Sequence, residues 1–170
     1  MKKRPEKGFT LFEMMVSVAI FSIITMLVGM ILQGGEEQVQ LAGLKMNLQE
    51  STRESLYQMG LEIRESSPSR IAIGSGGSAL TFQIPANVSN SGVITWSNPI
   101  TYQRGGNGTQ LVRISGGQTT ILANDIQNVT FSTSSGSPSS IIFAVTAQRT
   151  MINGRVLSVA STGEARLRNP

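Results

Sequence analysis

The sequence predicts an α+β protein: a long N-terminal α-helix, with a membrane-inserted half and an amphipathic half, packed on an antiparallel β-sheet domain. Three observations predict this class. An almost uncharged apolar run lies near the N-terminus, a segment with helical apolar spacing follows it, and the remainder alternates short β-rich runs with turn residues. The expected organisation is a leader at 1–8, a transmembrane helix at 9–32, an amphipathic helix at 33–66 and a β-rich domain at 67–170.

The apolar run at 9–32 is long enough to cross a membrane. Glu13 is its only charged residue and no proline interrupts it. As a helix it measures about 36 Å, more than the roughly 30 Å of a hydrocarbon core. The run is too long for the apolar core of a cleavable secretory signal, and a buried core helix is the remaining alternative. Basic residues precede the run and Glu36 and Glu37 follow it, so we expect a cytoplasmic N-terminus and an exported remainder.

The residues around the start of this run, KGFTLFEMMVSVAIF at 7–21, resemble the class III signal of type IV prepilins and pseudopilins. A basic leader ends in Gly8, Phe9 follows it, and Glu13 is the fifth residue after that break. The resemblance implies a type IV pilin-like fold. It also implies that a prepilin peptidase cleaves between Gly8 and Phe9 and methylates the new amino group, giving N-methylphenylalanine at Phe9 and retaining the helix.

Glu13 is an unusual residue for its position, because a carboxylate at bilayer depth costs a few kcal/mol and usually has a function. The resemblance implies that Glu13 meets the N-terminal amine of Phe9 in a neighbouring subunit and sets the register of assembly. An unpaired buried charge is penalised much more than a paired one is rewarded. The alternative is a glutamate that extends to the lipid headgroups and has no role in assembly.

The segment at 33–66 has the spacing of an amphipathic helix that continues the first one. Gly34 and Gly35 weaken the junction by up to about 1 kcal/mol each, so we expect a bend or local melting there. Pro68 disfavours helical geometry in the residue before it, which predicts an end near Ser66 and Ser67. The expected buried stripe consists of Leu41, Leu44, Leu48, Ser55 or Leu56, Met59 and Ile63, with three- to four-residue steps and a gap of about two turns after Leu48.

The β-rich part is expected to form antiparallel hairpins packed on the amphipathic helix. A helical segment at 53–68 is followed by a strand with Tyr102, a Leu-x-Arg strand at 111–113 and a final Arg-Leu-Arg-Asn strand at 166–169. This order resembles the globular part of PilW-type minor pilins and J-type minor pseudopilins of type II secretion. In the family that the chain resembles, many major pilins have a C-terminal disulfide and a proline within the membrane helix. This chain has no cysteine and no proline in its apolar run, so the resemblance implies a minor subunit. Strands are predicted at 70–73, 79–84, 92–96, 100–104, 110–114, 119–122, 126–132, 140–146 and 155–160.

The residue types present exclude much chemistry. The chain has no Cys and no His, and Asp125 is its only Asp. Thiol nucleophiles, disulfides, zinc sites built on Cys or His, and triads with an imidazole base are therefore impossible. We expect no enzyme activity, no cofactor and no metal site. A glycosidase-like carboxylate pair would need Asp125 and Glu164 to lie together.

The resemblance implies a structural subunit of the bacterial inner membrane, single-pass with an exported globular domain, that later enters a filament or pseudopilus. Its implied partners are prepilin peptidase, other minor and major pilins or pseudopilins, the inner-membrane assembly platform and, before assembly, membrane lipid. The expected role is in the initiating or tip complex of a type IV pilus or type II secretion pseudopilus. One alternative is an uncleaved, membrane-anchored exported protein. The other is a filament-tip subunit that binds DNA, with phosphate contacts from Arg149, Arg155, Arg166 and Arg168.

Overall fold

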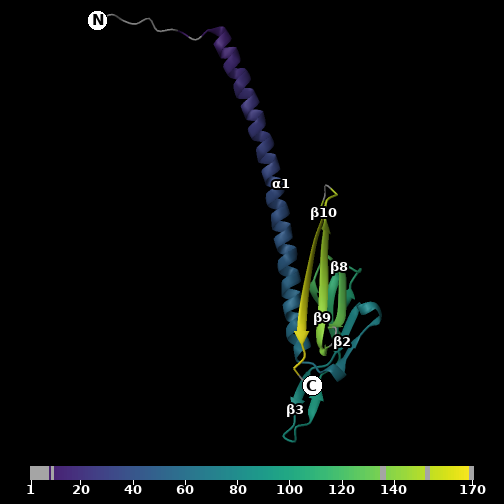
Figure 1. The fold of residues 1–170 in the computed structure, drawn as a ribbon. Coiled ribbons are helices and arrows are strands. Elements are labelled where there is room, and N and C mark those ends of the chain that lie inside the picture. The colour runs from purple at the N-terminus through teal and green to yellow at the C-terminus, as the bar shows by residue number, and fades with distance from the viewer. Residues whose placement is uncertain (1–7, 9, 135–136, 152–153, 169–170) are drawn as a thin grey trace, which may run out of the picture. The chain divides into compact units, whose positions relative to one another are not determined.

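The computed structural model describes residues 8, 10–134, 137–151 and 154–168 (Figure 1). It falls into two compact units, Met1–Gly43 and Leu44–Pro170. The α+β prediction is confirmed, since an apolar N-terminal helix is followed by a helical segment that packs on antiparallel sheets. In chain order the elements are α1 (Leu11–Arg64), η1 (Pro68–Arg70), β1 (Ile71–Ile73), η2 (Ser75–Gly77), β2 (Ala79–Phe82), β3 (Pro85–Val88), β4 (Ile94–Trp96), β5 (Ile100–Gly105), β6 (Gln110–Ser115), β7 (Gln118–Ala123), β8 (Ile126–Ser134), β9 (Ser137–Thr150) and β10 (Val156–Arg166).

The two expected helical segments form one unbroken element, α1. The helix continues through Gly34 and Gly35, so the expected local melting there is wrong, whereas a bend at this place stays a prediction. Glycine raises the conformational cost of a helix by only about 1 kcal/mol and, unlike proline, keeps the backbone N–H that the next turn needs. The helix ends at Arg64, close to the predicted end before Pro68.

The larger sheet has five antiparallel strands in the order β1-β2-β5-β6-β7. Leu80 and Tyr102 are cross-strand partners on its inner face, and both are fully buried. The turn from β6 to β7 consists of Gly116 and Gly117, with φ of 56° and 80°. Positive φ at both positions is typical of a type I′ hairpin, which matches the twist of the flanking strands.

The smaller sheet has three antiparallel strands in the order β10-β9-β8. Gly163 on β10 lies opposite Phe143 on β9, and a methyl group at position 163 would overlap the Phe143 ring. The same ring lies 3.6 Å from the place where a residue at Gly60 of α1 would carry its Cβ. Two glycines on different elements therefore make room for one buried aromatic ring.

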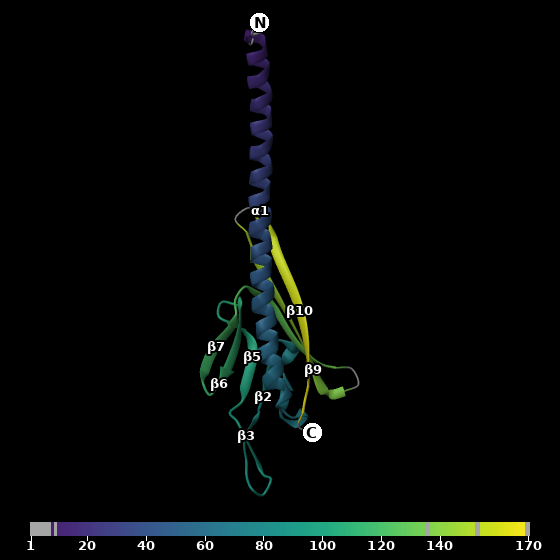
Figure 2. The same ribbon diagram turned by 90° about the vertical axis from the view of Figure 1, so that its left-hand side faces the viewer.

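Residues 44–64 of α1 cover one face of both sheets (Figure 2). The predicted apolar stripe is confirmed at Leu48, Met59 and Ile63, which are buried in the core. Ser55 is also buried, and its hydroxyl donates to the carbonyl of Leu122 on β7 at 3.3 Å. This stripe joins the helix to the sheets through apolar contacts and a small number of hydrogen bonds.

The segment after β10 caps the C-terminal end of α1. The N–H of Arg168 donates to the carbonyl of Arg64 at 2.9 Å, after β10 has run back along β9. The last carbonyls of a helix have no partner inside the helix, so this bond satisfies one of them.

Two differences from the predicted strands have physical reasons. The prediction omitted β3. This strand begins at Pro85, which is tolerated because proline can be the first residue of a strand, here in a two-stranded ribbon with β4. β9 and β10 are longer than predicted, with pairing that runs from Val156↔Thr150 to Arg166↔Ser140. The continuous ladder holds Ser161, Thr162 and Gly163 extended, although they lie beyond the predicted end of the strand at 160.

Candidate functional site

The start of α1 is held by a reciprocal pair of hydrogen bonds between Thr10 and Glu13. Oε2 of Glu13 accepts from the N–H and from the hydroxyl of Thr10, both at 2.9 Å. In return, the N–H of Glu13 donates to the Thr10 hydroxyl oxygen at 3.2 Å. This arrangement is a capping box, which satisfies donors that the first turn of a helix leaves free.

The capping box occupies one oxygen of the Glu13 carboxylate. Among the described residues, Oε1 of Glu13 has no hydrogen-bond partner. One oxygen can therefore close the helix start while the other meets a group from outside the chain. Pairing with the amine of Phe9 from a neighbour stays a prediction, and Phe9 lies outside the described residues. The capping role of Thr10 was missed from the sequence, although its T-x-x-E spacing with Glu13 is the signature of such a cap.

Gly8, the residue before the expected cleavage point, is exposed. A methyl group added at Gly8 would meet no atom within 4 Å. Packing against the residues that the structure describes therefore sets no requirement for glycine at position 8.

The segment Leu11–Leu32 is 22 residues long with a mean hydropathy of 2.5, enough to cross a membrane by length and composition. None of it is buried within the structure. Phe12 and Phe21, for example, are 74% and 71% exposed. A continuous apolar surface of this size needs cover from lipid or from other helices.

Three hydroxyl groups within this segment are satisfied by the helix itself. Ser17, Ser22 and Thr25 each donate to the carbonyl four residues earlier, at 2.8 Å. Such internal bonds reduce the cost of placing a hydroxyl in lipid. The segment therefore presents one carboxylate and an otherwise apolar surface.

The four arginines proposed for phosphate contacts are separated into two pairs. Arg149 and Arg155 lie near the turn between β9 and β10, whereas Arg166 and Arg168 lie at the other end of β10. Ten strand residues separate the two ends, about 33 Å at roughly 3.3 Å per residue. Arg149 is also ion-paired with Asp125, with 3.3 Å between Nε and Oδ2. The structure does not gather these side chains into one basic surface.

The two carboxylates considered for catalysis also lie apart. The carbonyl of Asp125, a turn residue with φ of 60°, accepts the N–H of Gln148 at 2.7 Å. Glu164 lies opposite Ile142 and accepts a hydrogen bond from Ser140. Six residues along β9 separate these two places, about 20 Å. The arrangement therefore does not bring Asp125 and Glu164 to one substrate-sized site.

Comparison with known proteins returns one finding. The family model of the prokaryotic N-terminal methylation motif matches residues 3–31. No curated protein and no solved structure matches the chain significantly. The chain thus carries a class III signal of the type IV pilin-like kind, which implies processing by prepilin peptidase and assembly with other pilin-like subunits.

Proposed function

We propose that this chain is a minor pilin or pseudopilin, a structural subunit that is processed at its N-terminus and co-assembles with related subunits. The observation that carries the proposal is the methylation motif at 3–31, in which Glu13 lies in the first turn of an exposed apolar helix and has one carboxylate oxygen without a partner among the described residues. A free carboxylate on an apolar helix suits a partner cation at the same depth, because both charges are costly in lipid when alone.

The finer role is assembly into the initiating or tip complex of a type IV pilus or a type II secretion pseudopilus. The resemblance of the β-rich part to PilW-type minor pilins and J-type minor pseudopilins supports a minor subunit. So do the absence of cysteine and of proline within 9–32. A minor subunit is expected in isolated filaments at far less than one copy per major pilin, and its deletion should reduce the number of filaments.

The proposed location is the bacterial inner membrane, with the chain crossing once and the β-rich unit exported. The charge distribution supports this orientation, since basic residues precede Leu11–Leu32 and acidic residues follow it. Before assembly the helix lies in lipid, and in a filament other helices take the place of lipid. The inner-membrane assembly platform and prepilin peptidase are the partners that this route requires.

The test is the intact mass and N-terminal peptide of membrane-extracted protein, with and without an active prepilin peptidase. We expect a mature chain that starts at methylated Phe9 only when the peptidase is present. Gly8→Val should block this processing; since a side chain at Gly8 meets nothing within 4 Å, misfolding would not explain the block. A chain that retains 1–8 beside an active peptidase would support the uncleaved, anchored alternative and would contradict the proposal.

DNA capture at a filament tip gains no support from the two separated arginine pairs. Binding to DNA by this chain should therefore be weak and should not fall selectively with Arg166→Ala. We propose that the chain acts as a structural subunit and not as an enzyme.

A further inference from the structure

The strand β10 has one free edge. It pairs with β9 alone. At one end of the ladder the N–H of Met151 donates to the carbonyl of Arg155, and at the other end the N–H of Leu167 donates to the carbonyl of Ser139, both at 2.8 Å. These two bonds show which residue pairs of the ladder are hydrogen-bonded. Hydrogen-bonded and non-bonded pairs alternate in an antiparallel ladder. The backbone groups of Ser158, Ala160 and Thr162 therefore point away from β9, and no described residue bonds to them.

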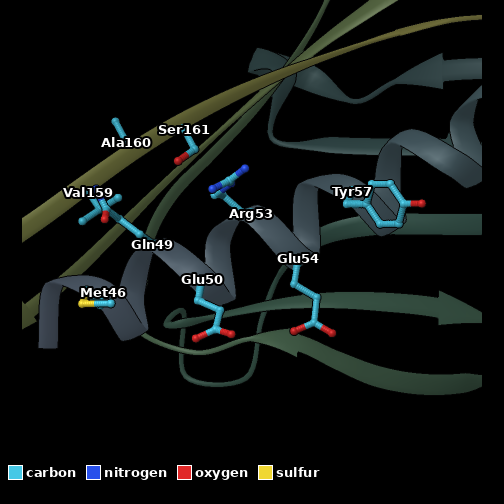
Figure 3. A pocket seen from close by; sticks show the side chains of 9 residues that line it. All are labelled: Met46, Gln49, Glu50, Arg53, Glu54, Tyr57, Val159, Ala160 and Ser161. Carbon is cyan, nitrogen blue, oxygen red and sulfur yellow. The ribbon is translucent and has the colours of Figure 1, made fainter. Parts of the chain in front are cut away.

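A groove of about 930 Å³ runs between this strand and α1 (Figure 3). Along the helix it extends from Met46 to Tyr57, about 17 Å at 1.5 Å per residue. An extended segment of about five residues has the same length. Its lining residues are Met46, Gln49, Glu50, Arg53, Glu54, Tyr57, Val159, Ala160 and Ser161.

The groove has one charge directed toward the strand. In Figure 3 the Arg53 side chain points toward β10 on the side of Ser161, whereas the carboxylates of Glu50 and Glu54 point away from the strand. Among the described residues Arg53 has no hydrogen-bond or ion-pair partner. An unpaired guanidinium beside a row of free backbone groups is suited to an acidic ligand with its own free backbone groups.

The remaining wall offers apolar surface. Met46 and Tyr57 are each 67% exposed, although both are large side chains on the half of α1 that belongs to the folded unit. Val159, which lines the groove from β10, is buried. Side chains of an added strand would alternate between this wall and the opposite face.

We propose that an extended segment of a different subunit pairs with the free edge of β10 as an additional strand and places a carboxylate against Arg53. This inference rests on the proposed function, because it assumes co-assembly. The segment is apolar at its other groove-facing positions, where it contacts Met46 and Tyr57. Main-chain hydrogen bonds supply affinity in this mode of recognition, and side-chain pockets supply specificity.

An edge strand from a second copy of this chain does not match the groove, because it would bring no carboxylate to Arg53. The other strands with a free edge, β1, β3, β4, β7 and β8, contain no acidic residue within their described bounds. On β10 itself the groove is lined by Val159, Ala160 and Ser161, which are uncharged, and Glu164 lies on the opposite face of the strand from Val159 and Ser161. None of these strands brings a carboxylate to Arg53, so charge complementarity selects another chain.

The test uses the full-length chain expressed with its partner subunits. Ala160→Pro removes one outward N–H without removing a bond to β9. The matched control is Thr119→Pro on the free edge of β7, where the N–H also points away from its neighbour. We expect Ala160→Pro to reduce co-purification with other subunits about tenfold at an unchanged melting temperature, and Thr119→Pro to behave as wild type. If both variants co-purify with the other subunits to the same extent as the wild-type chain does, the proposal is overturned.

A second measurement keeps the proposal testable if Ala160→Pro fails to fold. The chain has no cysteine, so Ala160→Cys supplies a unique thiol for cross-linking in cells, with the bound peptide identified by mass spectrometry. We expect a segment of another subunit that contains Asp or Glu. Arg53→Glu should weaken association, and Lys in place of that acidic residue should restore it. A cross-link to a second copy only, or to a segment without a carboxylate, would contradict the inference.

The same samples separate this inference from the proposed function. Mature, methylated protein that is recovered with other subunits at wild-type levels in Ala160→Pro and in Arg53→Glu would overturn the edge-pairing inference and leave the pilin-like function intact. A chain that is never processed would overturn the function itself.

Discussion

Glu62 near the end of α1 and Arg113 on β6 form an ion pair, with 2.9 Å between Oε2 and Nε. The same carboxylate accepts the hydroxyl of Tyr102 at 2.8 Å. Tyr102 and Arg113 are cross-strand partners, so two neighbouring strands direct their donors at one helix residue. The hydrogen bond to Glu62 raises the pKa of Arg113, and burial, followed by the Glu62 charge, raises the pKa of Tyr102. This cluster joins the helix end to the centre of the five-stranded sheet.

Glu62→Ala should lower the free energy of unfolding by about 1–3 kcal/mol, because it leaves the buried Tyr102 hydroxyl and the Arg113 guanidinium without their acceptor. Glu54→Ala, which removes an exposed carboxylate from the same helix, is the control and should change stability by less than about 0.5 kcal/mol. Chemical denaturation of the detergent-solubilised chain measures both. Equal effects of the two substitutions would show that the cluster contributes nothing specific.

Stability should fall as the pH rises above about 10, the ordinary pKa of tyrosine. The folded-state pKa of Tyr102 lies above the unfolded-state value, so the folded chain keeps a proton that the unfolded chain loses. The contribution is complete below pH 10 and declines above it, by at most about 1.4 kcal/mol per pH unit for one group. Tyr102→Phe should reduce this slope in denaturation measurements between pH 9 and about 11. An unchanged slope in Tyr102→Phe would assign the loss to other groups.

Gly163→Ala should destabilise the β-rich unit by about 1–3 kcal/mol, since the added methyl group overlaps the Phe143 ring and forces it to move. Gly43→Ala, where the methyl group meets nothing within 4 Å, should be neutral or slightly stabilising. Thermal unfolding compares the two variants. Phe143→Leu in the Gly163→Ala background should recover part of the loss, and a purely additive double variant would argue against the overlap.

The two tasks of Glu13 can be separated by substitution. Glu13→Gln keeps a side chain that can cap Thr10 but removes the charge, whereas Thr10→Ala removes the cap partner and keeps the charge. If assembly uses the charge, Glu13→Gln should be processed normally yet enter filaments about tenfold less, and Thr10→Ala should lose much less. The ratio of assembled to mature protein gives the answer. Normal assembly of Glu13→Gln would contradict a role for the Glu13 charge in pairing with a neighbouring subunit.

Much of the fold could be predicted because local patterns and tertiary packing agree. The spacing of Leu48, Met59 and Ile63 predicts the buried face of α1, and these side chains are buried. Gly116 and Gly117 predict a hairpin turn, and both have positive φ. The β3 strand was not predicted, because the fit of Pro85 depends on whether its missing N–H faces a neighbour, which sequence does not tell.

The sequence was sufficient to select the residues of the N-terminal motif but not to place the four arginines relative to one another. Gly8, Phe9 and Glu13 could be selected because the motif is a local pattern, which the family comparison supports. Separation of the four arginines into two pairs could not be predicted, because it depends on the length and register of β9 and β10.

By itself the sequence determined the apolar span, the position of Glu13 within it, and the excluded chemistry, because each depends on which residues are adjacent or absent. Only the tertiary structure decided that Glu62 meets Tyr102 and Arg113, that Gly60 and Gly163 flank one ring, and that β10 has a free edge beside Arg53. Those relationships join residues far apart in the chain, and strand pairing and helix packing alone bring them together.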